Sequence, residues 1–125
     1  MPASIVTGKL DNKYTGRFTM TYVFDIDGTI CTNTNGEYST AEPLRDRIDT
    51  VNKLYDQGHT IHFLTARGMG RSGNSTAFAY DAFEDLTKSQ LQEWGVKYHR
   101  LFLGKPSGDF YIDDKGMKDE DFFGN

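Results

Sequence analysis

Acidic, hydroxyl and basic side chains stand directly after successive apolar runs of the sequence, where their chemistry could combine. Asp25 and Asp27 follow the first run, Thr65 closes the second, and Lys105 comes just after the third. Two carboxylates two positions apart on an extended chain point the same way, so Asp25 and Asp27 should face one pocket. Like charges a few ångströms apart drive one pKa up, and one carboxylate can then attack while the other, protonated, donates.

A second acidic pair, Asp113 and Asp114, follows a fourth apolar run. If all four runs end at one edge, their carboxylates converge there and would repel one another without a cation. A hard divalent ion with oxygen ligands is therefore expected, and Mg²⁺ is the first candidate. Lys105 and Thr65 would then hold the equatorial oxygens of a phosphoryl group during in-line transfer.

These residues can meet only if the apolar runs are neighbouring strands of one sheet. Residues 19–25, 60–65, 101–103 and 110–112 are rich in β-branched and aromatic side chains, which predicts four strands. Strands alternating with helices predict an α/β fold, a three-layer α/β/α, Rossmann-like domain with a central parallel sheet. In such a fold the ligand crevice lies outside the carboxyl ends of the strands, which gathers the polar residues.

Helical spacing of apolar residues accounts for the segments between the strands. One helix is predicted within residues 43–58, and a second follows a glycine-rich loop. Thr87 and Gln90 have the spacing of a capping box, so a third helix should begin there and end at Trp94. A short helix over residues 119–123 should open on acidic side chains and pack two aromatic rings on the sheet.

Size, charge and cysteine content narrow the class of protein. The chain has 125 residues and a mass of 14.2 kDa, which allows one domain, with residues 1–19 as a leader or optional strand and 20–125 as the domain. A net charge of −4 without a basic block argues against sequence-independent nucleic-acid binding. The longest apolar stretch is far too short for a membrane span, so no membrane contact is expected. The one cysteine, Cys31, is expected to be a packed thiol and fits a reducing cytoplasm.

Four strings in order along residues 20–115 carry a resemblance to a known family. They are Asp25-Ile26-Asp27-Gly28-Thr29, Leu64-Thr65-Ala66-Arg67, Gly104-Lys105-Pro106 and Tyr111-Ile112-Asp113-Asp114-Lys115. Together they resemble the four motifs of the haloacid dehalogenase superfamily of phosphotransferases. More narrowly, the chain looks like the small capless phosphatases associated with bacterial capsule and surface-polysaccharide biosynthesis.

The resemblance implies a role for each matching residue. Asp25 would be the nucleophile that forms an aspartyl-phosphate, and Asp27 would protonate the leaving group and activate the hydrolytic water. Mg²⁺ would be bound by Asp25, the main-chain carbonyl of Asp27, Asp113 and Asp114, the last directly or through water. Thr65 and Lys105 would hold the phosphoryl group. The substrate would be contacted by Gly28, Thr29, Ala66 and the two loop arginines Arg67 and Arg71.

The spacing of the motifs bears on the type of reaction. The intervals from Asp27 to Thr65 and from Thr65 to Lys105, 38 and 40 residues, are filled by predicted elements, whereas a separate cap domain needs about 50 residues or more. The site should therefore be open, or roofed by loops or by a neighbouring subunit of a homo-oligomer. Access of water favours hydrolysis over mutase chemistry.

The predicted function is hydrolysis of a small phosphorylated metabolite, with a sugar phosphate as the leading candidate. An open site also admits a polynucleotide end or a phosphoprotein, although the acidic pI of about 5.2 argues mildly against the polynucleotide. A third possibility is a non-catalytic module that binds a phosphoryl ligand on the same fold. The presence of a nucleophile argues against this module, because binding alone needs none.

Overall fold

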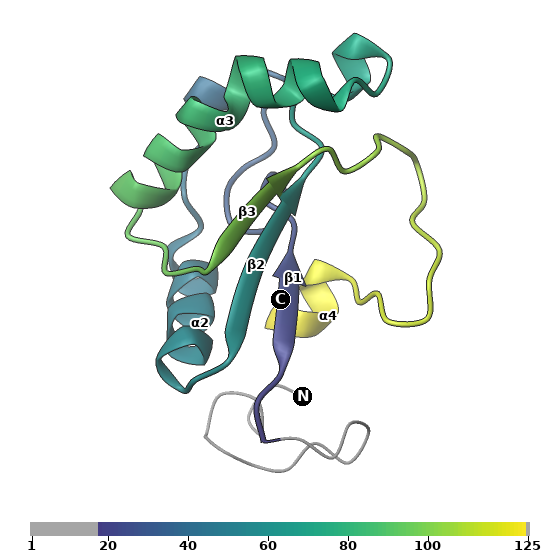
Figure 1. Cartoon of the computed structure of the whole chain (residues 1–125). Helices are drawn as coiled ribbons and strands as arrows, with labels where there is room; N and C mark the ends of the chain where they lie inside the picture. The colour runs from purple at the N-terminus through teal and green to yellow at the C-terminus, as the bar shows by residue number, and fades with distance from the viewer. Residues whose placement is uncertain (1–17, 125) are drawn as a thin grey trace.

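The sheet of this protein, seen in a computed structural model that describes residues 18–124, has three parallel strands. They are β1 (Thr21–Phe24), β2 (Thr60–Thr65) and β3 (Arg100–Leu103), in the spatial order β1-β2-β3 (Figure 1). In the register, Phe24 lies beside Phe63. The α/β class and the parallel sheet are thereby confirmed, while the predicted leader falls, except for its last two residues, outside the described residues.

Helices connect the strands. The α-helices are α2 (Arg45–Asp56), α3 (Thr76–Glu93) and α4 (Asp119–Phe123), and two short 3₁₀ turns are η1 (Tyr38–Thr40) and η2 (Gly70–Ser72). None of the helices within the described residues is long and apolar enough to cross a membrane.

The described helices pack on one face of the sheet. Ile61, Phe63 and Thr65 alternate along β2 toward this face and are buried. Because the strand order runs in one direction, two right-handed crossovers place α2 and α3 on the same side. The opposite face carries Val23, which is 60% exposed, and the half-buried Leu64. A helical layer on that face is not among the described elements, so the structure shows the parallel α/β arrangement but not the three layers.

The terminal helix α4 closes the apolar face beside β1. Its rings Phe122 and Phe123 contact Phe24 at centroid distances of 5.4 and 6.0 Å. Arg47 of α2 anchors the start of α4 through an ion pair of 2.7 Å with Asp119. The predicted short helix with two docking rings is thereby confirmed.

The predicted break between two helices at Thr87 is wrong, because α3 runs without interruption from Thr76 to Glu93. Thr87 and Gln90 stand three positions apart, which places them on one side of a helix as well as at capping-box spacing. Both side chains are buried and bind a side chain from another element. Trp94 directly follows the helix at its C-cap and is in the core as expected.

The predicted strand at residues 110–112 is also not formed. Only six residues, 104–109, connect the end of β3 to this segment. A crossover to a further parallel strand takes a dozen residues or more, because the chain must return to the opposite end of the sheet. Residues 104–118 instead form a long loop that leaves the end of β3 and passes outside the sheet before α4 (Figure 1).

Candidate active site

Three predicted catalytic residues lie at the carboxyl ends of the strands. Asp25 directly follows β1, Thr65 ends β2, and Lys105 lies two residues beyond β3. The Nζ atom of Lys105 is 3.8 Å from Oδ1 of Asp25, and the Lys105 amide donates to the main-chain oxygen of Thr65 at 3.2 Å. The expected juxtaposition of Asp25 and Lys105 is thus present, with the end of β2 held against Lys105.

The environment of Asp25 changes its acidity. Burial raises the pKa of its carboxyl above the ordinary value of 3.8, and the nearby Asp27 carboxylate adds to the rise. The ammonium of Lys105 and the backbone N–H of Ile26 oppose it, because both stabilise the ionised form. A carboxylate with a raised pKa is a better nucleophile than a fully solvated one, provided that it remains ionised.

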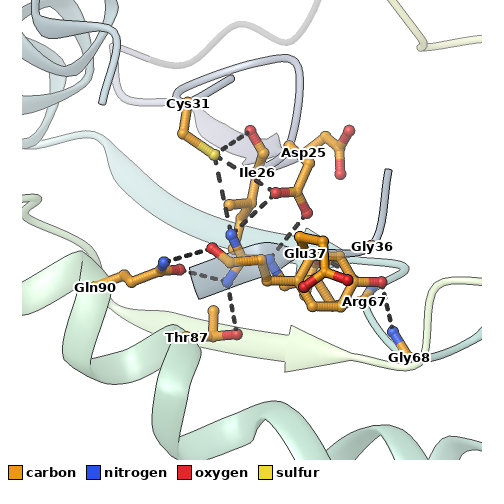
Figure 2. A network of polar contacts seen from close by, with 12 residues as sticks. Asp25, Ile26, Cys31, Gly36, Glu37, Arg67, Gly68, Thr87 and Gln90 are labelled. Carbon is orange, nitrogen blue, oxygen red and sulfur yellow. Dashed lines mark hydrogen bonds and ion pairs between the residues drawn. The ribbon is translucent and has the colours of Figure 1, made fainter. Parts of the chain in front are cut away.

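Asp27 is held by a buried arginine. Arg67 donates from Nε and Nη2 to the two carboxylate oxygens of Asp27, each at 2.9 Å. Its Nη1 donates to Thr87 Oγ1 at 3.1 Å and to Gln90 Oε1 at 2.6 Å (Figure 2). The guanidinium lies over the ring of Tyr38. This planar, bidentate geometry is one that lysine cannot reproduce.

The network changes the roles expected for two residues. The Arg67 side chain is 0% exposed, so the prediction that it contacts the substrate is wrong: its donors are directed to partners inside the protein. Both carboxylate oxygens of Asp27 accept from Arg67. Proton donation by Asp27 therefore requires that one of these hydrogen bonds opens, since a protonated oxygen offers Arg67 a poorer acceptor.

Sequence reasoning missed three members of this network, namely Tyr38, Thr87 and Gln90. Besides contacting Arg67, Tyr38 accepts from the Gly68 amide at its hydroxyl and from the Gln90 side chain at its main-chain oxygen. The available signal is the pair of polar residues three positions apart, Thr87 and Gln90, whose spacing fits a helix start as well as one face of a continuous helix. No local pattern marked Tyr38.

A cavity of about 460 Å³ opens beside the end of β2. Its walls come from the polar segment after β1, the loop around η2 and the start of the 104–118 loop, and its lining residues are Asn35, Gly36, Glu37, Tyr38, Ala66, Gly70, Arg71 and Ser107. Ala66 and Arg71 therefore lie where a substrate could reach them. Arg71 also donates to the Gly36 oxygen at 2.6 Å and lies over the rings of Tyr38 and Phe83.

Gly28 and Thr29 do not line this cavity. They form the tight turn after Asp27, where Gly28 has a φ of +79° and donates to the Cys31 oxygen at 2.9 Å. A Cβ at Gly28 would lie only 2.7 Å from the Asn33 side chain, so glycine is required by both backbone and space. These two residues, predicted as substrate contacts, have a structural role in the turn that follows Asp27.

The predicted Mg²⁺ ligands Asp113 and Asp114 are exposed in the 104–118 loop. Asp113 Oδ1 accepts from the backbone N–H groups of Lys115 and Gly116, which closes a local turn. Across residues 18–124, no three His, Cys, Asp or Glu side chains come together in a way that could hold a metal ion. The described residues of one chain therefore do not form the expected magnesium site.

Cys31 is buried behind the candidate site. Burial and the neighbouring Asp27 carboxylate raise the pKa of its thiol to about 12. Its Sγ donates to the Ile26 oxygen at 3.6 Å. The thiol is therefore protonated at neutral pH and, as expected, packed rather than activated.

Comparison with known proteins supports the fold. The chain is similar to a crystal structure of a structural-genomics target from Vibrio cholerae, with a TM-score of 0.77 and 24% identity over 84% of this chain and 88% of the other. No family model matches the sequence, and the curated proteins contain no match.

Proposed function

We propose that this protein is a phosphomonoester hydrolase and a capless member of the haloacid dehalogenase superfamily. The observation that carries the proposal is the Asp25 carboxylate 3.8 Å from the Lys105 ammonium at the carboxyl edge of a parallel sheet. A nucleophile and a cation at this position suit a transferring phosphoryl group. The four motif resemblances give the same assignment, and the single buried thiol fits a cytoplasmic location.

In the proposed reaction, a carboxylate oxygen of Asp25 attacks phosphorus and the bond to the leaving oxygen breaks. The leaving oxygen takes a proton, and water then attacks the aspartyl-phosphate to release inorganic phosphate and restore Asp25. Lys105 offsets the negative charge on the phosphoryl oxygens in both steps. Asp27, held by Arg67, would take the proton that the attacking water releases when one of its hydrogen bonds opens, and would return that proton to the leaving oxygen of the next turnover.

We also propose that the reaction requires Mg²⁺, which would supply charge neutralisation when bound. Asp25 offers a carboxylate to such an ion, whereas the Asp27 carboxylate is directed to Arg67. With Asp113 and Asp114 in the outer loop, the donor set formed by residues 18–124 of a single chain does not fit the ion. This incomplete set of metal ligands supports the alternative, a non-catalytic module that binds a phosphoryl ligand.

An assay of turnover distinguishes a phosphatase from a non-catalytic phosphoryl-binding module. The purified protein is incubated with para-nitrophenyl phosphate and Mg²⁺, and again with EDTA. Metal-dependent release of para-nitrophenol is expected. Binding of inorganic phosphate by calorimetry without any turnover would establish the binding module instead.

The proposed substrate is a sugar phosphate. The cavity reaches the candidate site at Ala66, the residue after Thr65, and its lining does not include Asp25 or Lys105. It is lined by amide, carboxylate, hydroxyl and guanidinium groups, which suit the hydroxyls of a sugar. Its volume of about 460 Å³ is within the range for small ligands. In the proposal, the phosphoryl group lies at Asp25 and the sugar extends over Ala66 toward Glu37.

Glu37→Gln is expected to raise the KM for sugar phosphates by about tenfold, equivalent to the roughly 1.4 kcal/mol of one charged hydrogen bond. The KM for para-nitrophenyl phosphate, which has no hydroxyls to bind, should change little. Steady-state kinetics on a panel of hexose phosphates measures both. Glu42→Gln, an exposed carboxylate of the same segment outside the cavity lining, is the matched control. Equal effects of the two substitutions would contradict this placement of the sugar.

Lys105→Ala is expected to move the acid limb of the pH profile of kcat/KM to higher pH. Lys105 lowers the pKa of Asp25, so its removal leaves burial unopposed by this charge and the pKa rises further. Because Asp25 must be ionised to attack, activity is then lost at a higher pH as acid is added. Lys115→Ala, in the exposed loop, is the control. A Lys105→Ala profile with its acid limb unmoved would show that Asp25 is not the titrating group.

A further inference from the structure

The outer edge of β1 has no strand partner among residues 18–124. In the order β1-β2-β3, β1 pairs only with β2. Val23, in the middle of β1, is 60% exposed. An open parallel-sheet edge with an exposed β-branched residue is a template for a further strand.

The same chain carries a segment suited to that edge. Phe110 and Ile112 are 85% and 94% exposed, and Tyr111 lies between them with 53% exposure. Among the described residues, the contacts of Tyr111 come from its own loop: its hydroxyl donates to the Pro106 oxygen at 2.7 Å and accepts from the Gly108 N–H at 3.1 Å, and its ring lies under Lys105. Three consecutive strand-forming residues with this much exposed apolar surface indicate a segment that is buried in another arrangement.

This segment cannot readily reach the β1 edge of its own sheet. From the end of β3 it would have to pass β2 and β1 and return to the amino end of the strands. The six connecting residues, 104–109, fall well short of the dozen or more that a parallel crossover needs. A second copy of the chain has no such limit, because its β1 can approach the segment from outside.

We infer that two copies of this chain exchange residues 110–112, each segment adding a parallel strand to the free edge of β1 in the other copy. The exchange carries Asp113 and Asp114 of one copy to Asp25 of the other, so each active site is shared. The inference rests on the proposed function for the role of these carboxylates.

The alternation of side chains along residues 110–113 and along β1 favours one register between the two strands. With Asp113 beside Asp25, Ile112 lies beside Phe24 and Tyr111 beside Val23. Ile112 then enters the apolar face closed by the rings of α4, and Tyr111 joins Val23 on the open face. A parallel orientation brings the acidic end of the segment to the carboxyl edge, where Asp25 lies. The two added carboxylates would complete the oxygen set that a hard divalent ion needs and that the described part of one chain lacks.

The activity of hetero-oligomers made from two different variants tests whether each active site is shared between two copies. Asp25→Asn and Asp113→Asn chains with different tags are co-expressed, and the hetero-oligomer is purified through both tags. In a twofold pair one site then has both substituted residues and the other has neither, so about half of the wild-type activity is expected. A hetero-oligomer as inactive as the two parents would overturn the inference. Asp109→Asn, an exposed carboxylate at the other end of the segment, should keep full activity.

A cross-link tests the exchange without any assay of activity. Val23→Cys and Tyr111→Cys chains are co-expressed and oxidised; neighbouring parallel strands place the two sulfurs within reach of a disulfide. A covalent pair of twice the chain mass is expected on a non-reducing gel, and none when Lys88→Cys replaces Tyr111→Cys. The native Cys31 is buried and does not compete.

The two measurements separate the possible failures. Wild-type phosphatase activity without a cross-linked pair or complementation would overturn the exchange and leave the proposed function intact. A cross-linked pair from a protein without turnover would overturn the proposed function while retaining the paired strands. A cross-link formed only when both cysteines are in one chain would place the segment on its own sheet and overturn the inference.

Discussion

Asp25→Asn is expected to lower the rate of phosphomonoester hydrolysis by roughly four orders of magnitude or more, the size of effect seen when a nucleophile is removed. An amide cannot form the acyl-phosphate bond, and the Asp27 carboxylate is held by Arg67 at both oxygens. The rate is measured with para-nitrophenyl phosphate under saturating conditions. Asp81→Asn, an exposed carboxylate on α3, should leave it unchanged.

The thermal stability of Asp25→Asn should not fall with its activity and should stay equal or rise slightly. The pKa of Asp25 is raised in the folded protein, so the ionised form is disfavoured there relative to the unfolded chain. The resulting loss of folding stability is absent at pH values below the pKa that Asp25 has in the unfolded chain. It is present in full at pH values above the pKa that Asp25 has in the folded protein. Asn removes the charge, so at neutral pH the variant should melt at the same temperature as the wild type or slightly higher. An inactive variant that is also strongly destabilised would point to a structural role for Asp25 rather than to nucleophilic attack.

Arg67→Met is expected to reduce the free energy of unfolding by about 3–5 kcal/mol, because it leaves the Asp27 carboxylate without its partner. The Asp27 side chain is 18% exposed, and Thr87 and Gln90 would also lose the donor that they share. Urea denaturation followed by circular dichroism measures the loss. Arg71→Met, which changes an exposed arginine of the loop, should cost no more than about 1 kcal/mol.

A second substitution shows whether the unpaired charge is the cause. Asp27→Asn in the Arg67→Met background removes the carboxylate that was left unpaired, so the double variant should be more stable than Arg67→Met alone. Arg67→Lys should behave like the methionine variant, since an ammonium cannot bind both oxygens of Asp27 in the same plane. An Arg67→Met protein as stable as the wild type would show that the network contributes nothing to folding.

The proposed exchange of residues 110–112 would also account for the incomplete set of metal ligands. It would bring Asp113 and Asp114 to the edge where the described residues of one chain have too few carboxylates for a metal ion.

Local patterns in the sequence were sufficient for most of the elements. The bounds of β2 were predicted as observed, and β1, β3 and α2 lie within three residues of their predicted ends. Periodic apolar side chains encode such elements because burial of one face repays the ordering of the backbone. The order of the elements then placed Asp25 and Lys105 at one edge, which the structure bears out with a separation of 3.8 Å.

Tertiary packing alone decided how the polar side chains are used. Whether Thr87 caps a helix or binds Arg67, and whether Arg67 reaches a substrate or Asp27, depends on which donor and acceptor are closest once the chain is folded. A buried hydrogen-bonding group must find a partner wherever the fold supplies one, and that partner is 40 residues away in the case of Asp27 and Arg67. The sequence by itself thus determined the elements and the edge at which they end, because periodicity is local. Only the folded structure decided the partners of Arg67 and the path of the 104–118 loop, because these depend on distances in space and on the length of chain available to cover them.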